Sequence, residues 1–468
     1  MNHRIFGSDL MRVFLSCLVC RLVTFVLQKM GRGATSMPGQ FALKVKRNVL
    51  ADLSKDVKVI IVTGTNGKTT SCRIIEEGLK EAGKTYFINK SGANLITGVT
   101  AAFIMNSTLS GKATKEYAIV ECDENAFKEV SRYIRADVIL VTNVFRDQLD
   151  RYGEVTHTLN AIKESVKNLP DATVCLDADC SLTYSMSKEI PNKILTFGVN
   201  VPFDKNTKAP EISDAKYCIF CKSEYDYTYH TYGHLGGFVC PSCGYRRPEP
   251  DYAVTAVEEL RQNHSVVVAN FAGSENIVKI NIGGSYNVYN AIGCACALSA
   301  AGIDEKTVIS ALEHFNGAFG RMEQFDAGDG EHKVNIILVK NPAGFSQTMN
   351  FLAGIDDDFT MIVSLNDNGA DGRDVSWIWD VDFADIFKKN NVKDIYVSGK
   401  RCYDMAIRIK YEGTQGREIK VIENEDYEKL CDIATSQGRD VYIVPTYTSM
   451  MTMRPVIAKR LGGKEFWE

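Results

Sequence analysis

Residues 60–70 read Ile-Ile-Val-Thr-Gly-Thr-Asn-Gly-Lys-Thr-Thr, and this stretch decides the fold. The mostly β-branched run from Val57 to Val62 predicts a buried parallel strand. A glycine turn begins at Gly64, and Lys68 opens a helical segment that extends through residues 71–80. A strand, a glycine turn and a helix N-terminus together form a phosphate site, because backbone N–H groups and the positive end of the helix dipole point toward the anion.

The side chains of this loop predict the binding of ATP with magnesium. Lys68 is placed to reach the β- and γ-phosphates, and the Thr69 hydroxyl is placed to hold Mg²⁺. The general P-loop pattern has a glycine where this chain has Val62, so the pattern is missed by one position. The alternative is a glycine-rich turn in which the Lys-Thr pair has no function. The residues expected to contact ATP are Gly64, Thr65, Asn66, Gly67, Lys68, Thr69 and Thr70.

Length and composition set broad limits on the protein. A chain of 468 residues is expected to form two or three domains. Its net charge of −4 argues against nucleic-acid binding, which normally requires a basic face. The chain contains 14 cysteines, but an ATP-binding enzyme of this size belongs in the reducing cytosol, where paired cysteines hold a metal more often than a disulfide. A cytoplasmic location is therefore predicted.

Residues 1–45 contain an apolar run from Met11 to Leu27 that is interrupted by Arg21. A membrane span needs about 20 apolar residues, and a secretory signal should end in a cleavage site of small residues, so neither alternative fits well. We prefer an amphipathic helix that docks on the next domain or rests on the membrane surface, since the phosphate loop needs cytosolic ATP. Cys17 and Cys20 share a face of this helix and are expected to be core thiols.

Residues 46–325 are expected to form the nucleotide domain. Further predicted strands follow the first helix at residues 85–89, 117–124 and 136–143. Strands that alternate with helices indicate a parallel sheet, whose ligands bind at the carboxyl ends of the strands. Glu121 lies near such an end, where its carboxylate can help Thr69 to coordinate Mg²⁺. The alternative for Glu121 is a solvated charge at a strand terminus.

Four blocks of this region resemble the Mur ligases, which join amino acids to peptidoglycan precursors. The first block is the phosphate loop, and the others are Thr142-Asn143 with Asp147 and Leu149–Gly153, then Tyr286–Ala291, then Gly320–Glu323. They follow the order in which the family carries them. The resemblance implies that Asn287, Asn290 and Arg321 surround the adenosine part of ATP. Without the family, the two asparagines are simply neighbours at the start of a helix and could be caps.

Residues 212–250 contain two Cys-x-x-Cys pairs separated by 18 residues, Cys218 and Cys221, then Cys240 and Cys243. That spacing falls within the pattern of four-cysteine zinc sites. In such a closed tetrahedral site zinc is structural, and its binding is worth roughly 10–16 kcal/mol in isolated peptides, enough to fold a segment with almost no core. Disulfides are the alternative, and the reducing compartment argues against them. His234 is expected to be a turn residue rather than a ligand.

The cysteine insertion narrows the resemblance to one branch, the MurT-type subunit of lipid II isoglutaminyl synthase. Mur ligases that add amino acids generally lack a zinc ribbon in the ATP domain. They also carry an Asp-Tyr-Ala-His-Asn-Pro sequence early in the C-terminal domain, of which this chain keeps only Asn341-Pro342. The expected fold is therefore α/β: a Mur-ligase-like P-loop domain with a parallel sheet and an inserted zinc ribbon, then a smaller α/β domain over residues 326–468.

The densest polar stretch of that C-terminal domain is Asn366–Asp380, which follows a predicted buried strand. A loop in that position is a site more often than a spacer, although an acidic surface loop with its tryptophans docked inward is the alternative. By the resemblance, Asp374 completes the catalytic triad of a GatD-type glutaminase, the partner that supplies the cysteine and the histidine. An aspartate in that role holds the correct histidine tautomer and stabilises the imidazolium.

The resemblance implies an ATP-dependent carbon–nitrogen ligase of peptidoglycan biosynthesis. The α-carboxyl of D-glutamate in the lipid II stem peptide would become an acyl phosphate, with Mg²⁺ and Lys68 neutralising charge, and ammonia from the glutaminase would then give D-isoglutamine. A cytoplasmic protein that meets this lipid at the inner face of the membrane is expected. The alternatives are a Mur or folylpolyglutamate-type ligase that adds an amino acid, and a non-catalytic scaffold built by nucleotide and zinc.

Overall fold

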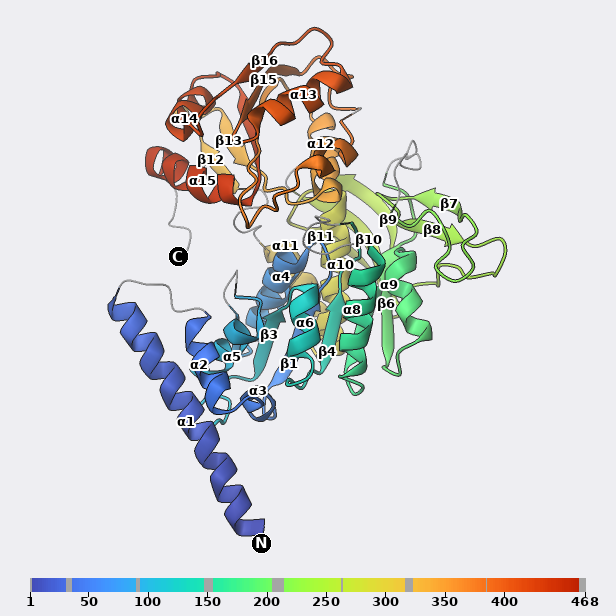
Figure 1. Ribbon diagram of the computed structural model, residues 1–468. Helices are drawn as coiled ribbons and strands as arrows, with labels where there is room; N and C mark the ends of the chain where they lie inside the picture. Colours follow the sequence, from blue (N-terminus) through green and yellow to red (C-terminus); the bar gives the residue numbers. More distant parts are fainter. Residues whose placement is uncertain are drawn as a thin grey trace. The chain divides into compact units, whose positions relative to one another are not determined.

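The computed structural model describes residues 2–30, 36–89, 93–146, 155–203, 214–261, 264–315, 323–383 and 385–462, with side chains from residue 9 onward. The chain forms two compact units (Figure 1). Unit 1 contains residues 1–145 and 155–316, and unit 2 contains residues 146–154 and 317–468. Each unit is described by itself below.

Unit 1 is built on a nine-stranded sheet with the order β11-β10-β9-β6-β5-β4-β1-β3-β2. The strands from β2 to β9 in this order are parallel, and β10 and β11 continue the sheet as antiparallel strands. Their bounds are β1 Lys58–Thr63, β2 Tyr86–Ile88, β3 Tyr117–Glu121, β4 Val138–Val141, β5 Thr173–Asp177, β6 Ile194–Val199, β9 Tyr252–Leu260, β10 Ser265–Phe271 and β11 Ser274–Ile280. The predicted parallel sheet is confirmed.

Helices cover both faces of this sheet (Figure 1). One layer contains α4 (Lys68–Glu81), α10 (Ser285–Ala300) and α11 (Glu305–His314), which contact one another. The other contains α5 (Ile96–Met105), α6 (Glu124–Val130) and α8 (Val155–Lys167), and short helices lie at α3 (Val49–Leu53) and α9 (Ser181–Ser185). With both faces covered, the central strands are apolar throughout, and Ile60, Ile61 and Ile119 are fully buried.

The position of β1 in the sheet places the phosphate loop. β1 pairs with β3 on one side and with β4 on the other. The chain therefore leaves β1 at the point where the strand order changes direction, and open α/β sheets bind ligands at that point.

The cysteine insertion forms a two-stranded antiparallel ribbon, β7 (Asp226–His230) and β8 (Gly236–Val239). The ribbon has a small core of its own, in which Tyr225, Phe238 and Tyr245 pack beside Cys218 and Cys240. So small a core cannot stabilise the segment alone, which is the situation in which a bound metal supplies folding energy.

Unit 2 has a six-stranded sheet with the order β12-β13-β17-β14-β15-β16. All of its pairs are parallel except β12–β13. The strands are β12 Glu323–Asp326, β13 Lys333–Ile336, β14 Phe359–Ser364, β15 Val392–Ser398, β16 Ile419–Val421 and β17 Asp440–Pro445. The helices are α12 Pro342–Ala353, α13 Cys402–Glu412, α14 Tyr427–Thr435 and α15 Tyr447–Leu461, with a 3₁₀ turn, η2, at Ser376–Asp380. Separate apolar clusters cover its two faces.

The N-terminal segment forms α1 (Asn2–Lys29) and α2 (Met37–Val45), and α1 packs on α2 and α5. Cys17 and Cys20 are fully buried on the packed face, as expected of core thiols. The opposite face of α1 exposes large apolar side chains, including Leu22 and Phe25. The helix docks on the next domain as predicted. It is not amphipathic, because apolar side chains occupy its outer face as well as the face that packs on the protein.

Candidate nucleotide site and zinc ribbon

The loop after β1 contains two glycines with backbone dihedral angles that other residues rarely adopt. Gly64 has φ +120° and Gly67 has φ +87°. A Cβ atom at Gly64 would lie 2.4 Å from Thr142 Oγ1, and one at Gly67 would lie 2.1 Å from Asn290 Oδ1. Glycine is therefore required at each position for two reasons: the dihedral angle, and the side chain that lies where a Cβ atom would be.

The residues that follow β4 hold the loop from outside. Asn143 Oδ1 accepts a hydrogen bond from the Asn66 backbone N–H at 2.9 Å, and the Thr142 hydroxyl donates to Asn66 O at 2.6 Å. The Thr65 hydroxyl accepts from the backbone N–H of Phe145 at 3.1 Å and donates to the Phe145 carbonyl at 3.2 Å. These contacts fix the backbone of the loop at Thr65 and Asn66.

Lys68 is the first residue of α4 and curls over its own loop. Its Nζ donates to Gly64 O at 2.5 Å and to Thr65 O at 3.1 Å, and it forms an ion pair with Glu124 at 3.2 Å. Glu124 is buried, so the cation has a stable partner in this state. To reach a phosphate, the flexible Lys68 side chain must exchange these contacts for phosphate oxygens.

Thr69 and Glu121, the two predicted magnesium ligands, lie together. The Thr69 hydroxyl donates to Glu121 Oε1 at 2.9 Å. Asn89 holds the backbone of Glu121 on both sides, accepting from its N–H at 2.8 Å and donating to its carbonyl at 3.0 Å. A hydroxyl and a buried carboxylate at this distance are hard oxygen donors of the kind that Mg²⁺ prefers, and the donor set fits that ion. Thr70 is buried in the next position of α4.

The asparagines of α10 face the loop from the other side. Asn290 lies against Gly67 and donates to Asn287 Oδ1 at 3.0 Å, and Asn287 donates to Gly283 O at 2.6 Å. Both side chains are buried. Asn290 therefore lies at the phosphate loop and Asn287 is hydrogen-bonded to it, and neither is the N-cap of α10, which is Gly284.

Some predicted positions lie outside the described residues. These are Arg321 and the segment 147–153. Glu323, which ends the Gly-Arg-x-Glu block, is described in unit 2, where it forms an ion pair with the buried Arg454 at 2.8 Å.

The four cysteines of the ribbon converge as the spacing predicted. The sulfurs of Cys218, Cys221, Cys240 and Cys243 all lie within 4.8 Å of one another. The Cys218–Cys243 and Cys221–Cys240 sulfurs are 3.6 and 3.3 Å apart. Tetrahedral zinc with bonds of about 2.3 Å requires sulfurs about 3.8 Å apart, so the cluster fits zinc. Hydrogen bonds from Ser223 lower the pKa of Cys221 to about 6, whereas burial and the neighbouring sulfurs raise the pKa of Cys243.

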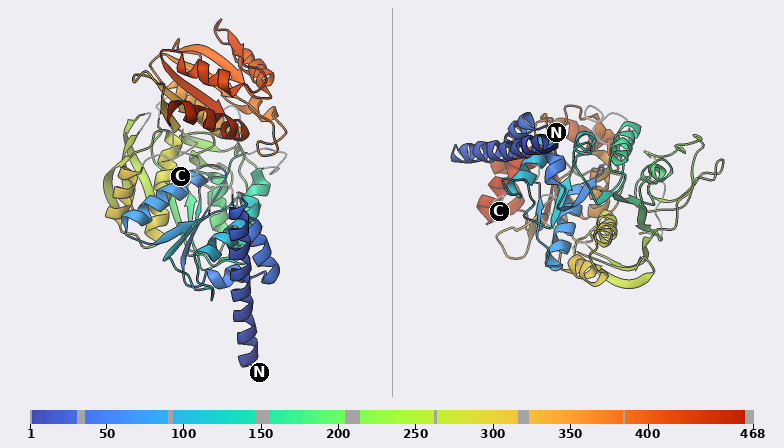
Figure 2. Two further views of the ribbon diagram at one scale, coloured as in Figure 1. Left: turned by 90° about the vertical axis from the view of Figure 1, so that its left-hand side faces the viewer. Right: turned by 90° about the horizontal axis from the view of Figure 1, so that it is seen from below.

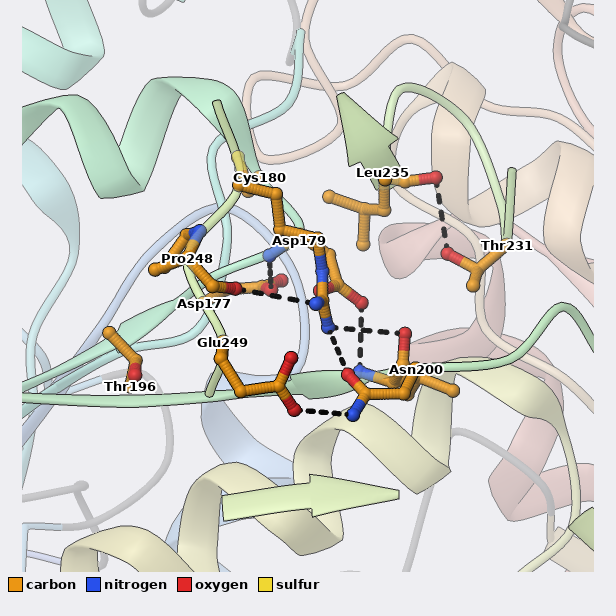
Figure 3. A network of polar contacts seen from close by, with 12 residues as sticks. Asp177, Asp179, Cys180, Thr196, Asn200, Thr231, Leu235, Pro248 and Glu249 are labelled. Atoms are coloured by element: carbon orange, nitrogen blue, oxygen red, sulfur yellow. Dashed lines mark hydrogen bonds and ion pairs between the residues drawn. The ribbon is translucent and has the colours of Figure 1, made fainter. Parts of the chain in front are cut away.

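A buried ion pair ties the ribbon to the sheet. Arg247 donates to Asp179 Oδ1 at 2.6 Å and to Asn200 Oδ1 at 2.7 Å, and Asp179 Oδ2 accepts from the Val199 N–H at 2.9 Å. Tyr289 of α10 also donates to Asp179. Figure 3 shows Asp179 and Asn200 side by side in this network. Because Asp179 has no exposed surface, losing Arg247 would leave an unpaired buried charge, at a cost of about 3–5 kcal/mol.

The turn of the ribbon also reaches the phosphate loop. The Phe145 ring stacks on Tyr232 with centroids 5.7 Å apart, and it lies 4.5 Å from the His234 ring. The backbone of Phe145 in turn holds the Thr65 hydroxyl. Burial lowers the pKa of His234 to about 4, so the imidazole is neutral beside Cys180, whose sulfur lies 3.2 Å from Nε2. His234 is thus a turn residue, as predicted, and its buried ring also packs against Phe145.

In unit 2 the Asn366–Asp380 stretch is held at the ends of β14 and β17. Asp371 is buried and accepts from the Thr448 N–H at 2.8 Å. Asp374 is half-buried, and its Oδ1 accepts from the Ser376 N–H at 2.8 Å. Hydrogen bonds from the Ser376 hydroxyl and backbone lower the pKa of Asp374, so it is ionised at neutral pH. Trp377 is buried inward, whereas Trp379 is exposed, so the inward-docked alternative holds for only one of the two tryptophans.

Sequence reasoning missed several residues of these sites. Glu124 is one of several acids near the end of β3, and nothing in the sequence marks it as the partner of Lys68. Phe145, Asp179 and Arg247 carry no motif, because their partners are distant in sequence. Arg247, beside the second Cys-x-x-Cys, is a buried cation, and no local pattern distinguishes it from the adjacent Arg246.

Comparison with known proteins agrees with this geometry. Residues 62–238 match the Mur ligase middle domain, and residues 338–450 match the MurT ligase C-terminal domain. The chain is 35% identical over 450 residues to the MurT subunit of the glutamine-hydrolyzing lipid II isoglutaminyl synthase of Streptococcus pneumoniae, covering 96% of this chain and 98% of that protein. It is 31% identical to the corresponding Staphylococcus aureus subunit, covering 97% and 99%.

Solved structures show the same fold at lower identity. The pseudomurein peptide ligase type C of Methanothermus fervidus superposes with a TM-score of 0.65 at 20% identity, covering 87% of this chain and 79% of that one. MurF of Acinetobacter baumannii gives a TM-score of 0.65 at 17% identity, covering 90% and 80%. The chain therefore belongs to the Mur ligase family and, within it, to the MurT subunits of lipid II isoglutaminyl synthase.

Proposed function

We propose that this chain uses ATP to amidate the α-carboxyl of D-glutamate in the lipid II stem peptide, with ammonia from a glutaminase partner. Its relatives are named as subunits of a glutamine-hydrolyzing lipid II isoglutaminyl synthase. The observation that carries the proposal is the loop after β1, where Lys68, the Thr69–Glu121 pair and the α4 N-terminus converge. This arrangement suits the transfer of a phosphoryl group.

The reaction divides into two displacements. A carboxylate oxygen attacks the γ-phosphorus of ATP, ADP leaves, and an acyl phosphate forms. The ammonia nitrogen then attacks the carbonyl carbon, phosphate leaves, and one proton is lost as the amide forms. Lys68 and the loop N–H groups bind the phosphates, and the Asn66 backbone held by Asn143 keeps the loop in place.

Two metals have separate parts in the proposal. Thr69 and Glu121 would hold Mg²⁺, which would supply positive charge to neutralise the phosphates. Zinc at the four cysteines would be structural, since four thiolates complete its coordination.

The surface near Asp374 favours a protein partner. Trp379 follows Asp374 by five residues, and its ring lies 5.5 Å from that of Tyr411 on α13. Tyr403, Ile407 and Tyr411 occupy one face of α13, and Tyr411 is 77% exposed. Exposed aromatic side chains such as these are typical anchors of a protein interface, and Asp374 lies in the same segment of the chain as Trp379. We propose that the glutaminase docks here and that Asp374 completes its triad.

One experiment separates this proposal from its alternatives. ADP release is measured with lipid II and either ammonium or the glutaminase with glutamine. The proposal expects turnover under both conditions and none without a nitrogen source. Release driven by a free amino acid would instead identify a ligase that adds that residue. Release under no condition would leave a nucleotide- and zinc-dependent scaffold.

A further inference from the structure

The outer face of α1 is an apolar surface that no described residue of unit 1 covers. It comprises Met11, Phe14, Leu15, Leu22, Phe25 and Val26, each between 37% and 58% exposed. Successive members are adjacent or lie three or seven positions apart, so they form one stripe along the helix. Figure 2 shows α1 at the margin of unit 1, where its N-terminal end extends beyond the neighbouring helices. We propose that this outer face docks α1 on the surface of an anionic lipid bilayer.

The opposite face of α1 is fastened to the enzyme by polar contacts. Ser16 donates to Ala42 O at 3.2 Å, Arg21 donates to Ile104 O at 3.1 Å and also to Ser107 O, and Asp9 pairs with Lys46 at 2.7 Å. α1 is therefore part of the domain, and its outer face belongs to the folded protein.

These contacts distinguish a helix on the membrane from a helix through it. Residues 9–29 are long and apolar enough to cross a bilayer, on length and composition alone. A crossing helix would have to give up the Arg21 contacts and place the guanidinium near the middle of the hydrocarbon, where charges are rare and costly. A helix that lies in the interface keeps Arg21 on the protein side and immerses only the apolar stripe.

The charge of the segment matches an anionic surface. Residues 1–47 contain eight lysines and arginines and one acid, Asp9, in a chain whose net charge is −4. Arg21 and the buried Lys46 face the protein, and the other six cations leave the segment basic. Lys29 Nζ lies 4.9 Å from the Phe25 ring centroid, and Lys44 Nζ lies 5.3 Å from that of Phe41. An aromatic body with a cationic tip suits the boundary between acyl chains and anionic headgroups.

The choice of a bilayer as the occupant rests on the proposed lipid-linked substrate. A lipid carrier confines its stem peptide to the membrane surface, so an enzyme held there by a second contact searches in two dimensions. The site of chemistry and the docking face remain separate, and they can be tested separately.

The test is flotation of the full-length protein with vesicles that contain no lipid II. Wild type should float with vesicles of phosphatidylglycerol and phosphatidylcholine, more weakly with phosphatidylcholine alone, and less as salt rises. The double variant Phe14→Gln/Phe25→Gln should lose at least about tenfold in vesicle-bound fraction, because two exposed rings no longer enter the acyl region. Lys29→Gln/Lys44→Gln should lose mainly the salt-dependent part.

The matched control is Leu260→Gln/Ile277→Gln, which removes two exposed apolar side chains elsewhere in unit 1 and should bind vesicles like wild type. Ammonia-driven amidation of detergent-solubilised lipid II should be equal in all of these proteins. If none of the proteins amidates lipid II, the proposed function is refuted and the flotation result still holds.

Three outcomes would overturn the docking proposal. One is wild type that does not float, or a Phe14→Gln/Phe25→Gln variant that floats equally well. A second is protein that resists alkaline carbonate extraction from the vesicles, which would identify a span. The third is a wild-type protein that forms a dimer and does not bind vesicles, while the Phe14→Gln/Phe25→Gln variant is monomeric. That result would assign the face to a second copy of the chain.

Discussion

At the scale of single residues, the proposed nucleotide site consists of side chains that are hydrogen-bonded or ion-paired with one another. Lys68 is bonded to two carbonyls of its own loop and paired with Glu124, and Thr69 is bonded to Glu121. These contacts hold the charged side chains of the loop in place. They also mean that a substitution here removes both a ligand and a contact of the resting loop.

Lys68→Ala should reduce ATP turnover by at least about a hundredfold, because removing one group that stabilises developing charge costs that much or more. Zinc content should remain that of wild type, since Lys68 makes none of the ribbon's contacts. ADP release and metal analysis measure the two effects. Lys80→Ala, at the exposed end of α4, is the control and should retain wild-type turnover. Retained turnover in Lys68→Ala would remove this residue from the site.

Asp374→Asn should lower glutamine-driven amidation by orders of magnitude and leave ammonia-driven amidation unchanged. The carboxylate is ionised at neutral pH and is proposed to hold the partner's histidine, a role that the amide cannot fill. Rates with the two nitrogen sources are compared in the complex. Asp385→Asn, another surface aspartate of unit 2, should change neither rate. Equal loss with both sources would contradict the triad assignment.

His234 should make unit 1 less stable in mild acid. The folded chain holds its pKa near 4, against about 6.5 when unfolded, so the neutral form is favoured by folding. Its contribution is complete above pH 6.5 and is lost as the pH falls toward 4, about 2 kcal/mol of it between pH 7 and pH 5. His234→Asn should show a correspondingly smaller loss in denaturant unfolding, while zinc release affects both chains alike. An identical pH dependence would show that the imidazole is not held neutral.

At the scale of elements, the four-cysteine ribbon and the loop after β1 are linked by Phe145, which follows the end of β4. The ribbon turn packs on Phe145, and the Phe145 backbone exchanges two hydrogen bonds with the Thr65 hydroxyl. The ion pair of Arg247 with Asp179 fixes the other end of the ribbon on the sheet. The ribbon therefore packs against Phe145, the residue whose backbone holds Thr65 of the loop.

Phe145→Leu should raise the KM for ATP several-fold and cost about 1–2 kcal/mol of stability, less than a change to alanine, because the smaller side chain leaves Tyr232 and His234 without the ring between them. Steady-state kinetics and thermal unfolding report the two effects. Phe220→Leu, whose ring packs on Tyr245 within the same ribbon, should cost stability without changing the KM. A KM that stays constant in Phe145→Leu would separate the ribbon from the nucleotide loop.

At the scale of the whole molecule, each of the two compact units has a sheet and core of its own. Zinc binds to unit 1 in the proposal, so its removal should act on that unit alone. A chelator, or Cys218→Ser, should lower the temperature of one calorimetric transition and leave the other unchanged. Cys402→Ser, in the core of unit 2, should retain zinc. A single transition that shifts as a whole would show that the units unfold together.

The parts of the site that the sequence predicted are those whose geometry is local. Gly64 to Thr70 form a strand–turn–helix within a few residues, and each Cys-x-x-Cys forms its own knuckle, so spacing alone indicates the chemistry. Glu121 was predicted because parallel strands end at one edge of a sheet. The antiparallel strands β10 and β11 were not predicted, and the alternating burial along β10 does not by itself specify its neighbours in the sheet.

What the sequence determined by itself was the α/β class, the phosphate loop and the four-cysteine cluster, since each is specified by residues close together in the chain. Only the tertiary structure decided that Asn290 closes on Gly67, that Asp179 receives Arg247 and Tyr289, and that the outer face of α1 is left apolar. Those pairings join residues far apart in sequence, and they depend on which surfaces packing buries, a property that no local pattern of residues encodes.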